Sequence, residues 1–149
     1  MQWQDNLITT DDQLRELLSK TRTIAVLGIK PEDRAGQPAF YVPQYMQERG
    51  YDIIPVPVYY PHVTEILGRP VYRTLASIPD DVDMVNVFRR SQDVAAHLDD
   101  ILAKRPKSVW LQMGIRDDET AETLAREGIK VVQDMCLMVV DRMFNRASA

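Results

Sequence analysis

The sequence contains a single cysteine, Cys136, and so cannot form an internal disulfide. A fold that depends on disulfides is therefore excluded, and a cytoplasmic location is expected. Long hydrophobic runs are also missing, because the apolar segments 24–27 and 137–140 fall far short of the roughly 20 residues that a membrane-spanning helix needs. Residues 1–6 have neither the basic nor the apolar region of a signal peptide. We expect no contact with a membrane.

Positive charge is not in excess. The chain has 18 Lys and Arg residues against 22 Asp and Glu residues, which gives a formal net charge of −4. Proteins that coat nucleic acids are usually basic on balance, so no nucleic-acid partner is expected. A small phosphate-bearing ligand in a local basic pocket is compatible with this charge.

Glycine is scarce as well, and its positions disfavour a dinucleotide ligand. No G-x-G-x-x-G pattern follows the apolar run that ends at Gly28, since the next glycine is Gly36. No Asp or Glu ends the second predicted strand at residues 56–58, where an NAD site would hold the ribose. Both absences argue against NAD.

What remains is the composition of a globular domain. Apolar residues make up 45% of the chain and charged residues 27%, as is ordinary for globular proteins. The length predicts one domain over residues 1–149 with a buried core. Short apolar runs predict strands at 23–28, 51–56, 83–88, 108–112 and 129–132, and a further short strand near Val71 and Tyr72. Pro55 and Pro57 predict that the second strand leaves the ladder early.

Helical patterns alternate with these strands. Thr10 and Gln13 form a capping box, which begins a helix that runs to about Lys20. Ser91 is the expected N-cap of a helix whose apolar face continues to Leu102. Further helices are expected from Pro38 or Pro43 to Gly50, at 118–127, and at 137–144, where an extended tail is the alternative. This βαβ order predicts a Rossmann-like three-layer α/β/α sandwich with a mostly parallel sheet of about five strands.

The carboxyl edge of the predicted sheet is the expected place for a ligand. Right-handed crossovers bring the carboxyl ends of all parallel strands to one edge, and ligands of such sheets bind there. The residues at this edge are 28–30, 56–58, 88–90, 112–114 and 134–136.

Several residues at this edge suit phosphate binding. Gly28 would let backbone N–H groups approach a phosphate, although a purely structural glycine at a strand exit is an equal alternative. Phe88-Arg89-Arg90 places two guanidinium groups beside a flat ring, an arrangement that suits phosphate pairing. Lys30 and Arg34 add positive charge on the first loop. For all these cations, the alternative is a solvated surface.

Catalytic and metal-binding patterns are absent from the sequence. His62 and His97 lie away from the carboxyl edge of the predicted sheet, and we interpret each as a structural or a surface residue. Cys136 lies at the edge, but a lone cysteine without a nearby histidine is more often a packed small side chain than a nucleophile. No Cys/His cluster has metal-ligand spacing. We therefore predict no catalytic residue and no metal ligand.

A resemblance to a known family rests on segments across residues 20–140. These segments are 24–28, 50–51, 54–57, 65–68, 75–79, 83–90, 109–114 and 134–136. The most specific are Asp-x-Val-x-Val-Phe-Arg-Arg at 83–90 and Trp-Leu-Gln-x-Gly at 110–114. With them the chain resembles the small free-standing CoA-binding proteins, which are similar to the N-terminal CoA-binding domain of the succinyl-CoA synthetase α subunit.

The resemblance implies coenzyme A or an acyl-CoA as ligand, with its 3′-phospho-ADP end at the strand ends. The implied cofactor-binding residues, together with those chosen from charge and position, are Gly28, Ile29, Lys30, Arg34, Val56, Pro57, Phe88, Arg89, Arg90, Gln112, Met113, Gly114 and Cys136. Of these, Gln112 to Gly114 would border the pantetheine. The sequence departs from the family where Ile29-Lys30 replaces a small residue and serine, and where 55–58 reads Pro-Val-Pro-Val instead of Pro-Val-Asn-Pro. The first change exchanges a hydroxyl for a cation, and the second removes a side-chain amide.

The expected function is a CoA-binding module. The larger ligase of the resemblance uses a phosphorylated histidine in a second domain, so this chain alone is expected to hold CoA without ligation. Two alternatives remain open at this point. One is an enzyme or redox protein that uses Cys136 near the CoA thiol, and the other is a partner-binding subunit of a separate acyl-CoA ligase. The sequence gives no oligomeric state.

Overall fold

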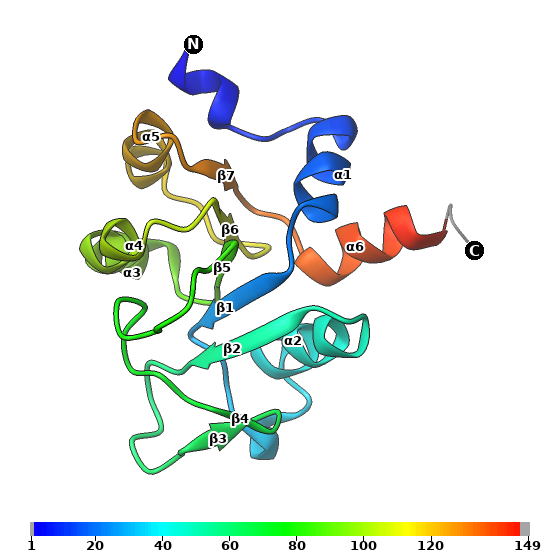
Figure 1. The fold of residues 1–149 in the computed structure, drawn as a ribbon, viewed down its shortest axis with the longest axis vertical. Helices are drawn as coiled ribbons and strands as arrows, with labels where there is room; N and C mark the ends of the chain where they lie inside the picture. The colour runs from blue at the N-terminus through cyan, green and yellow to red at the C-terminus, as the bar shows by residue number, and fades with distance from the viewer. Residues whose placement is uncertain (1, 147–149) are drawn as a thin grey trace.

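The computed structural model describes residues 2–146, and a five-stranded sheet runs through its centre (Figure 1). The sheet order is β2-β1-β5-β6-β7, and every neighbouring pair is parallel. The strands are β1 (Thr23–Leu27), β2 (Asp52–Val56), β5 (Met84–Val87), β6 (Ser108–Leu111) and β7 (Lys130–Val132). The predicted parallel sheet of the Rossmann-like class is confirmed.

Helices cover both faces of the sheet, as Figure 1 shows. One layer holds α1 (Asp11–Ser19), α2 (Pro38–Glu48) and α6 (Leu137–Arg146). The other holds α3 (Ser91–Val94), the 3-10 turn η3 (Ala95–His97), α4 (Leu98–Lys104) and α5 (Asp118–Arg126). Two further 3-10 turns, η1 (Trp3–Asn6) and η2 (Glu32–Arg34), precede α1 and α2 in the chain. No helix within residues 2–146 is long and apolar enough to cross a membrane.

Alternation along the strands creates two separate cores. In β1, Ile24 and Val26 pack into the cluster under α1, α2 and α6, whereas Ala25 and Leu27 pack into the cluster under α4 and α5. Successive side chains of a strand point to opposite faces, so a strand that is apolar throughout needs cover on both sides. Trp110 of β6 is fully buried, and its indole N–H donates to the Met135 carbonyl at 2.8 Å.

The capping predictions hold for α1 and α2. Thr10 Oγ1 accepts from the Gln13 backbone, and the Gln13 side chain accepts from the Thr10 backbone, so the capping box is confirmed. Pro38 occupies the first turn of α2, and Pro43 lies inside that helix. Residues 137–146 form a helix, which settles the choice between helix and extended tail.

The segment after β2 differs from the prediction. β2 stays in the ladder to Val56, with Pro55 paired to Val26. Pro55 is tolerated because β2 is an edge strand, where a missing N–H costs no ladder bond. The short strands are β3 (Glu65–Ile66) and β4 (Arg69–Pro70), and β4 ends directly before Val71, so the short strand predicted near Val71 and Tyr72 is present within two residues of that position. Leu67 and Gly68 both have positive φ, 55° and 73°, so they form the tight hairpin turn between β3 and β4.

Ser91 is not an N-cap. Arg90 occupies the N-cap position of α3, and the predicted single helix is broken into α3, η3 and α4. The Ser91 hydroxyl instead accepts from the Arg116 backbone at 2.9 Å and donates to the Gly114 carbonyl at 3.4 Å. Its side chain therefore ties the start of α3 to the loop that follows β6.

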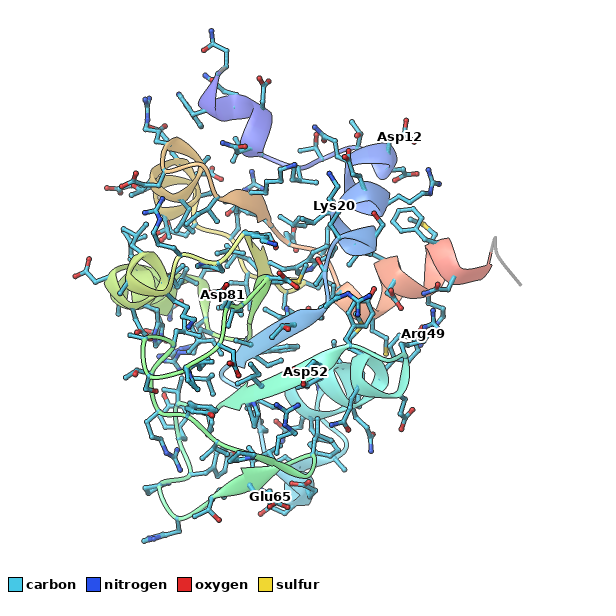
Figure 2. The ribbon with its side chains drawn as sticks, viewed as in Figure 1. Asp12, Lys20, Arg49, Asp52, Glu65 and Asp81 are labelled. Atoms are coloured by element: carbon cyan, nitrogen blue, oxygen red, sulfur yellow. The ribbon has the colours of Figure 1, made fainter. Side chains whose placement is uncertain are left out.

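A buried carboxylate joins α6 to the chain between α2 and β2. Asp141 accepts from the Tyr51 hydroxyl at 2.8 Å and from Arg49 Nε at 3.4 Å. Figure 2 shows Arg49 beside α6, at the end of α2. Burial, together with the hydrogen bond to Asp141, raises the pKa of Tyr51 well above its ordinary value. The network fixes α6 against the amino edge of the sheet.

Candidate ligand-binding cleft

A cleft of about 510 Å³ lies at the carboxyl ends of β1, β5 and β6. The chain passes from β1 to β2 on one side and returns to β5 on the other, so the strand order reverses between β1 and β5. Ligands of open parallel sheets bind at such a reversal. The lining residues are Gly28, Ile29, Lys30, Gln37, Pro38, Ala39, Val58, Tyr59, Tyr60, Phe88, Arg89, Arg90, Gln112, Met113, Gly114 and Ile115.

Gly28 forms the floor of the cleft between two neighbouring segments. Its N–H donates to the Val56 carbonyl at 2.9 Å, and its φ is +90°. A Cβ atom at this position would lie 2.2 Å from the Phe88 carbonyl oxygen. Only glycine fits, because both the backbone conformation and the available space exclude a side chain.

The loop after Gly28 leads into the N-terminus of α2. The Lys30 N–H donates to the Ala39 carbonyl at 3.1 Å, and the Lys30 ammonium group contacts the Gln37 side chain. Gln37, the N-cap of α2, makes no capping hydrogen bond with its side chain to any described residue. A helix N-terminus attracts anions through its free N–H groups and the helix dipole. At this N-terminus Pro38 has no N–H, and the Gln37 N–H donates to the Arg34 carbonyl at 2.9 Å, so the Ala39 N–H and the helix dipole are what α2 offers to a phosphate.

The two arginines after β5 have different environments. The Arg89 side chain is 15% exposed, its Nε donates to His97 Nε2 at 3.2 Å, and its guanidinium carbon lies 5.4 Å from the centre of the Tyr59 ring. The Arg90 side chain is 73% exposed and pairs with Asp93 at 2.9 Å. Arg89 is thus held in place from two sides, whereas Arg90 is a mostly solvated cation.

Tyrosines of the 58–63 segment form another wall. Arg73 donates to the carbonyls of Tyr59 at 3.1 Å, Tyr60 at 2.9 Å and Val63 at 2.6 Å, which holds this segment in shape. Tyr60 has a positive φ of 65°. Its hydrogen bond with Arg34 raises the pKa of that guanidinium above the ordinary value. Tyr59 is 62% exposed as a residue, and its ring adds a flat apolar surface to the cleft beside Arg89.

The remaining wall follows β6. Gln112 is buried, and its Oε1 accepts from the Leu137 N–H at 3.3 Å and from Asn86 Nδ2 at 3.4 Å. The Gly114 N–H donates to Asp134 at 2.6 Å. Met113 is 62% exposed and presents an apolar side chain. This wall is less charged than the one formed by the arginines.

Most of the residues predicted from the sequence line this cleft together. They are Gly28, Ile29, Lys30, Phe88, Arg89, Arg90, Gln112, Met113 and Gly114. Arg34, Val56, Pro57 and Cys136 do not belong to the lining. Arg34 reaches it only through Tyr60, and Val56 uses its carbonyl to hold Gly28. Cys136 is buried just before α6, where its carbonyl accepts from the Val140 N–H at 3.0 Å.

Sequence reasoning missed several lining residues. They are Gln37, Pro38, Ala39, Tyr59, Tyr60 and Ile115, whereas Val58 belongs to the predicted edge but not to the predicted ligand-binding residues. Pro38 offered a usable signal, since proline at a first helical turn marks the helix N-terminus that phosphates favour. The sequence predicts His97 to be a structural or surface residue, and the structure shows that it accepts a hydrogen bond from Arg89 of the cleft. Among the residues that the structure describes, no three His, Cys, Asp or Glu side chains come together in a way that could hold a metal ion.

The fold and the cleft define a class of proteins, the Rossmann-like domains that bind a ligand at the carboxyl edge of a parallel sheet. A family described as a CoA binding domain matches residues 22–142, and the chain belongs to this family. It is 33% identical over 127 residues to the uncharacterized protein YneT of Bacillus subtilis, covering 85% of this chain and 90% of YneT.

Solved structures share this fold. A protein from Thermus thermophilus, designated cell-free ID.343, is 40% identical with a TM-score of 0.82, and the match covers 91% of this chain and 98% of that one. A hypothetical protein from Pyrococcus horikoshii is 29% identical with a TM-score of 0.81, covering 91% and 92% of the two chains.

Proposed function

We propose that the protein binds coenzyme A or an acyl-CoA in the cleft at the ends of β1, β5 and β6. The observation that supports this most is the convergence of three phosphate-binding features in a chain of the CoA binding domain family. These features are the glycine turn at Gly28, the fixed guanidinium of Arg89 and the N-terminus of α2 at Gln37. The cleft volume of about 510 Å³ lies within the range of small-molecule sites.

The two ends of the ligand fit different walls. The 3′-phospho-ADP part is anionic and suits the wall of Gly28, Lys30, Arg89 and Arg90. The pantetheine part is uncharged and suits the segment from Gln112 to Gly114, where a buried amide lies beside the exposed Met113. Val56 and Pro57 would support the nucleotide end from behind Gly28. The proposal is for ligand binding alone; Cys136 and His62 lie outside the cleft lining and have no part in it.

Calorimetric titration tests this proposal. CoA should bind with measurable heat and raise the thermal unfolding midpoint, because a ligand that binds only the folded state stabilises it. ATP and NAD serve as comparison ligands and should bind more weakly, since each lacks the pantetheine arm. The absence of both heat and thermal shift with CoA would reject the proposal.

Substitution of the two arginines should have unequal effects. Arg89→Ala is expected to weaken CoA binding by about 10–100-fold, the cost of losing a hydrogen bond to a charged group. Arg90→Ala should weaken it by less than about fivefold, because an exposed ion contributes little. Arg15→Ala, which removes the same charge outside the cleft, is the control and should leave the affinity unchanged. Equal effects at both cleft positions would contradict this assignment.

A further inference from the structure

His97 is the direct partner of the arginine on which the proposed function depends. The Arg89 Nε donates to His97 Nε2 at 3.2 Å, and His97 is half-buried at the end of η3. Guanidinium has five N–H groups, so this bond uses one and leaves those of the two terminal nitrogens. An anion in the cleft can be recognised by these terminal groups while Nε stays engaged.

The histidine must be neutral to accept this hydrogen bond. An imidazolium carries N–H on both nitrogens and has no acceptor. Burial, followed by the positive charge of Arg89, lowers the pKa of His97, and the carboxylates of Asp100 and Asp93 oppose this shift. Asp100 is itself engaged by the N–H groups of Leu75 and Ala76, at 2.7 and 3.0 Å. At neutral pH, His97 is therefore an uncharged acceptor.

Asp93 cannot replace His97 in this role. Its carboxylate is 3.8 Å from Arg89 and 2.9 Å from Arg90, so it is bound mainly to the latter. A carboxylate close to Arg89 would also offset the positive charge that an anionic ligand needs. A neutral imidazole fixes the guanidinium and leaves its charge intact.

We propose that His97 is a positioning residue for ligand binding, which holds the Arg89 guanidinium against the Tyr59 ring and ready for a phosphate of CoA. This inference rests on the proposed function. Arginine has many rotamers in solution, and ordering them before the ligand arrives lowers the entropy lost on binding. His97 itself does not line the cleft, so it acts through Arg89.

Two substitutions at His97 test this role by titration with CoA. His97→Ala should lower the affinity about tenfold, the cost of one hydrogen bond to a charged group. His97→Gln should stay within about twofold of the wild type, because its amide oxygen can accept from Arg89 Nε. Equal losses in both variants would mean that the imidazole ring serves only packing and would overturn the inference.

A double-mutant cycle separates positioning from general destabilisation. In an Arg89→Ala background, His97→Ala should cause no further loss of affinity, since the group that it positions is gone. Independent losses that add would contradict the inference. Thermal unfolding of each variant identifies those that are folded at the assay temperature, and His97→Leu, which has no acceptor but fills a similar volume, replaces His97→Ala in the cycle if the latter is unfolded.

The pH dependence of the affinity for CoA distinguishes a hydrogen-bonding role of His97 from a role in packing alone. Because the pKa of His97 is lowered by burial and by Arg89, the imidazole becomes protonated only at a pH below the ordinary histidine pKa of about 6.5, and there the wild type should progressively lose affinity relative to His97→Gln. The ligand phosphates titrate equally in both proteins, so the ratio of the two affinities isolates His97. A constant ratio would overturn the inference. If the wild type does not bind CoA at all, the proposed function fails, whereas binding that is insensitive to His97 leaves that function standing.

Discussion

Replacing Gly28 with alanine is expected to lower the free energy of unfolding by about 2–5 kcal/mol and to abolish CoA binding. Two costs add at this position. A φ of +90° is unfavourable for any residue with a Cβ atom. That atom would also lie 2.2 Å from the Phe88 carbonyl oxygen and 3.0 Å from its carbonyl carbon.

The backbone of Phe88 cannot shift away from Gly28 without breaking hydrogen bonds of the sheet. The Phe88 N–H donates to the Leu27 carbonyl at 2.8 Å, and the Gly28 N–H donates to the Val56 carbonyl at 2.9 Å. Moving Phe88 away would separate β1 from β5 at the end of the sheet, and it would displace the adjacent Arg89. Stability and ligand binding should therefore fall together.

Two other glycines provide matched controls, measured by urea unfolding and CoA titration. Gly50 has a φ of +103°, and a Cβ atom there would have no described neighbour within 4 Å, so Gly50→Ala should cost about 1–2 kcal/mol from conformation alone. Gly36 is open and has no positive φ, so Gly36→Ala should be nearly neutral or slightly stabilising. A Gly28→Ala protein as stable as Gly36→Ala would show that the contact with Phe88 is not a constraint.

The location of the cleft could be predicted because it follows from topology. Apolar runs such as 23–28 and 83–88 identify strands that are buried on both faces, and such strands belong to parallel sheets. Once the sheet is parallel, the residues after each strand must meet at one edge. Gly28, Arg89 and Gln112 could therefore be placed together from the sequence, although they are far apart in the chain.

The contributions of the loops could not be predicted in this way. Tyr59 and Tyr60 reach the cleft because Arg73, on a distant part of the same crossing, holds their carbonyls. Such side chain to backbone contacts have no periodicity that a sequence pattern reveals. Ser91 shows the reverse case, in which a sequence pattern predicts a contact that does not form. Serine is typical of an N-cap, but the Ser91 hydroxyl accepts from the Arg116 backbone N–H instead. Long-range contacts override the local preference in both cases.

Removal of the buried carboxylate on α6 is the second large effect that we expect. Asp141→Ala should lower the free energy of unfolding by about 2–4 kcal/mol, because it leaves the Tyr51 hydroxyl without its acceptor and breaks the pair with Arg49. The Asp141 side chain is only 3% exposed, so water cannot readily replace the lost oxygens. Urea unfolding measures this change.

Asp52→Ala is the matched control for the loss of an aspartate. Asp52 on β2, which is labelled in Figure 2, pairs with Arg69, and the two side chains are 49% and 40% exposed. This change should cost less than about 1 kcal/mol, since exposed ion pairs contribute little. Equal costs at the two positions would mean that burial of Asp141 does not determine its contribution. Because Asp141 lies outside the cleft lining, Asp141→Ala should retain its affinity for CoA wherever it is folded.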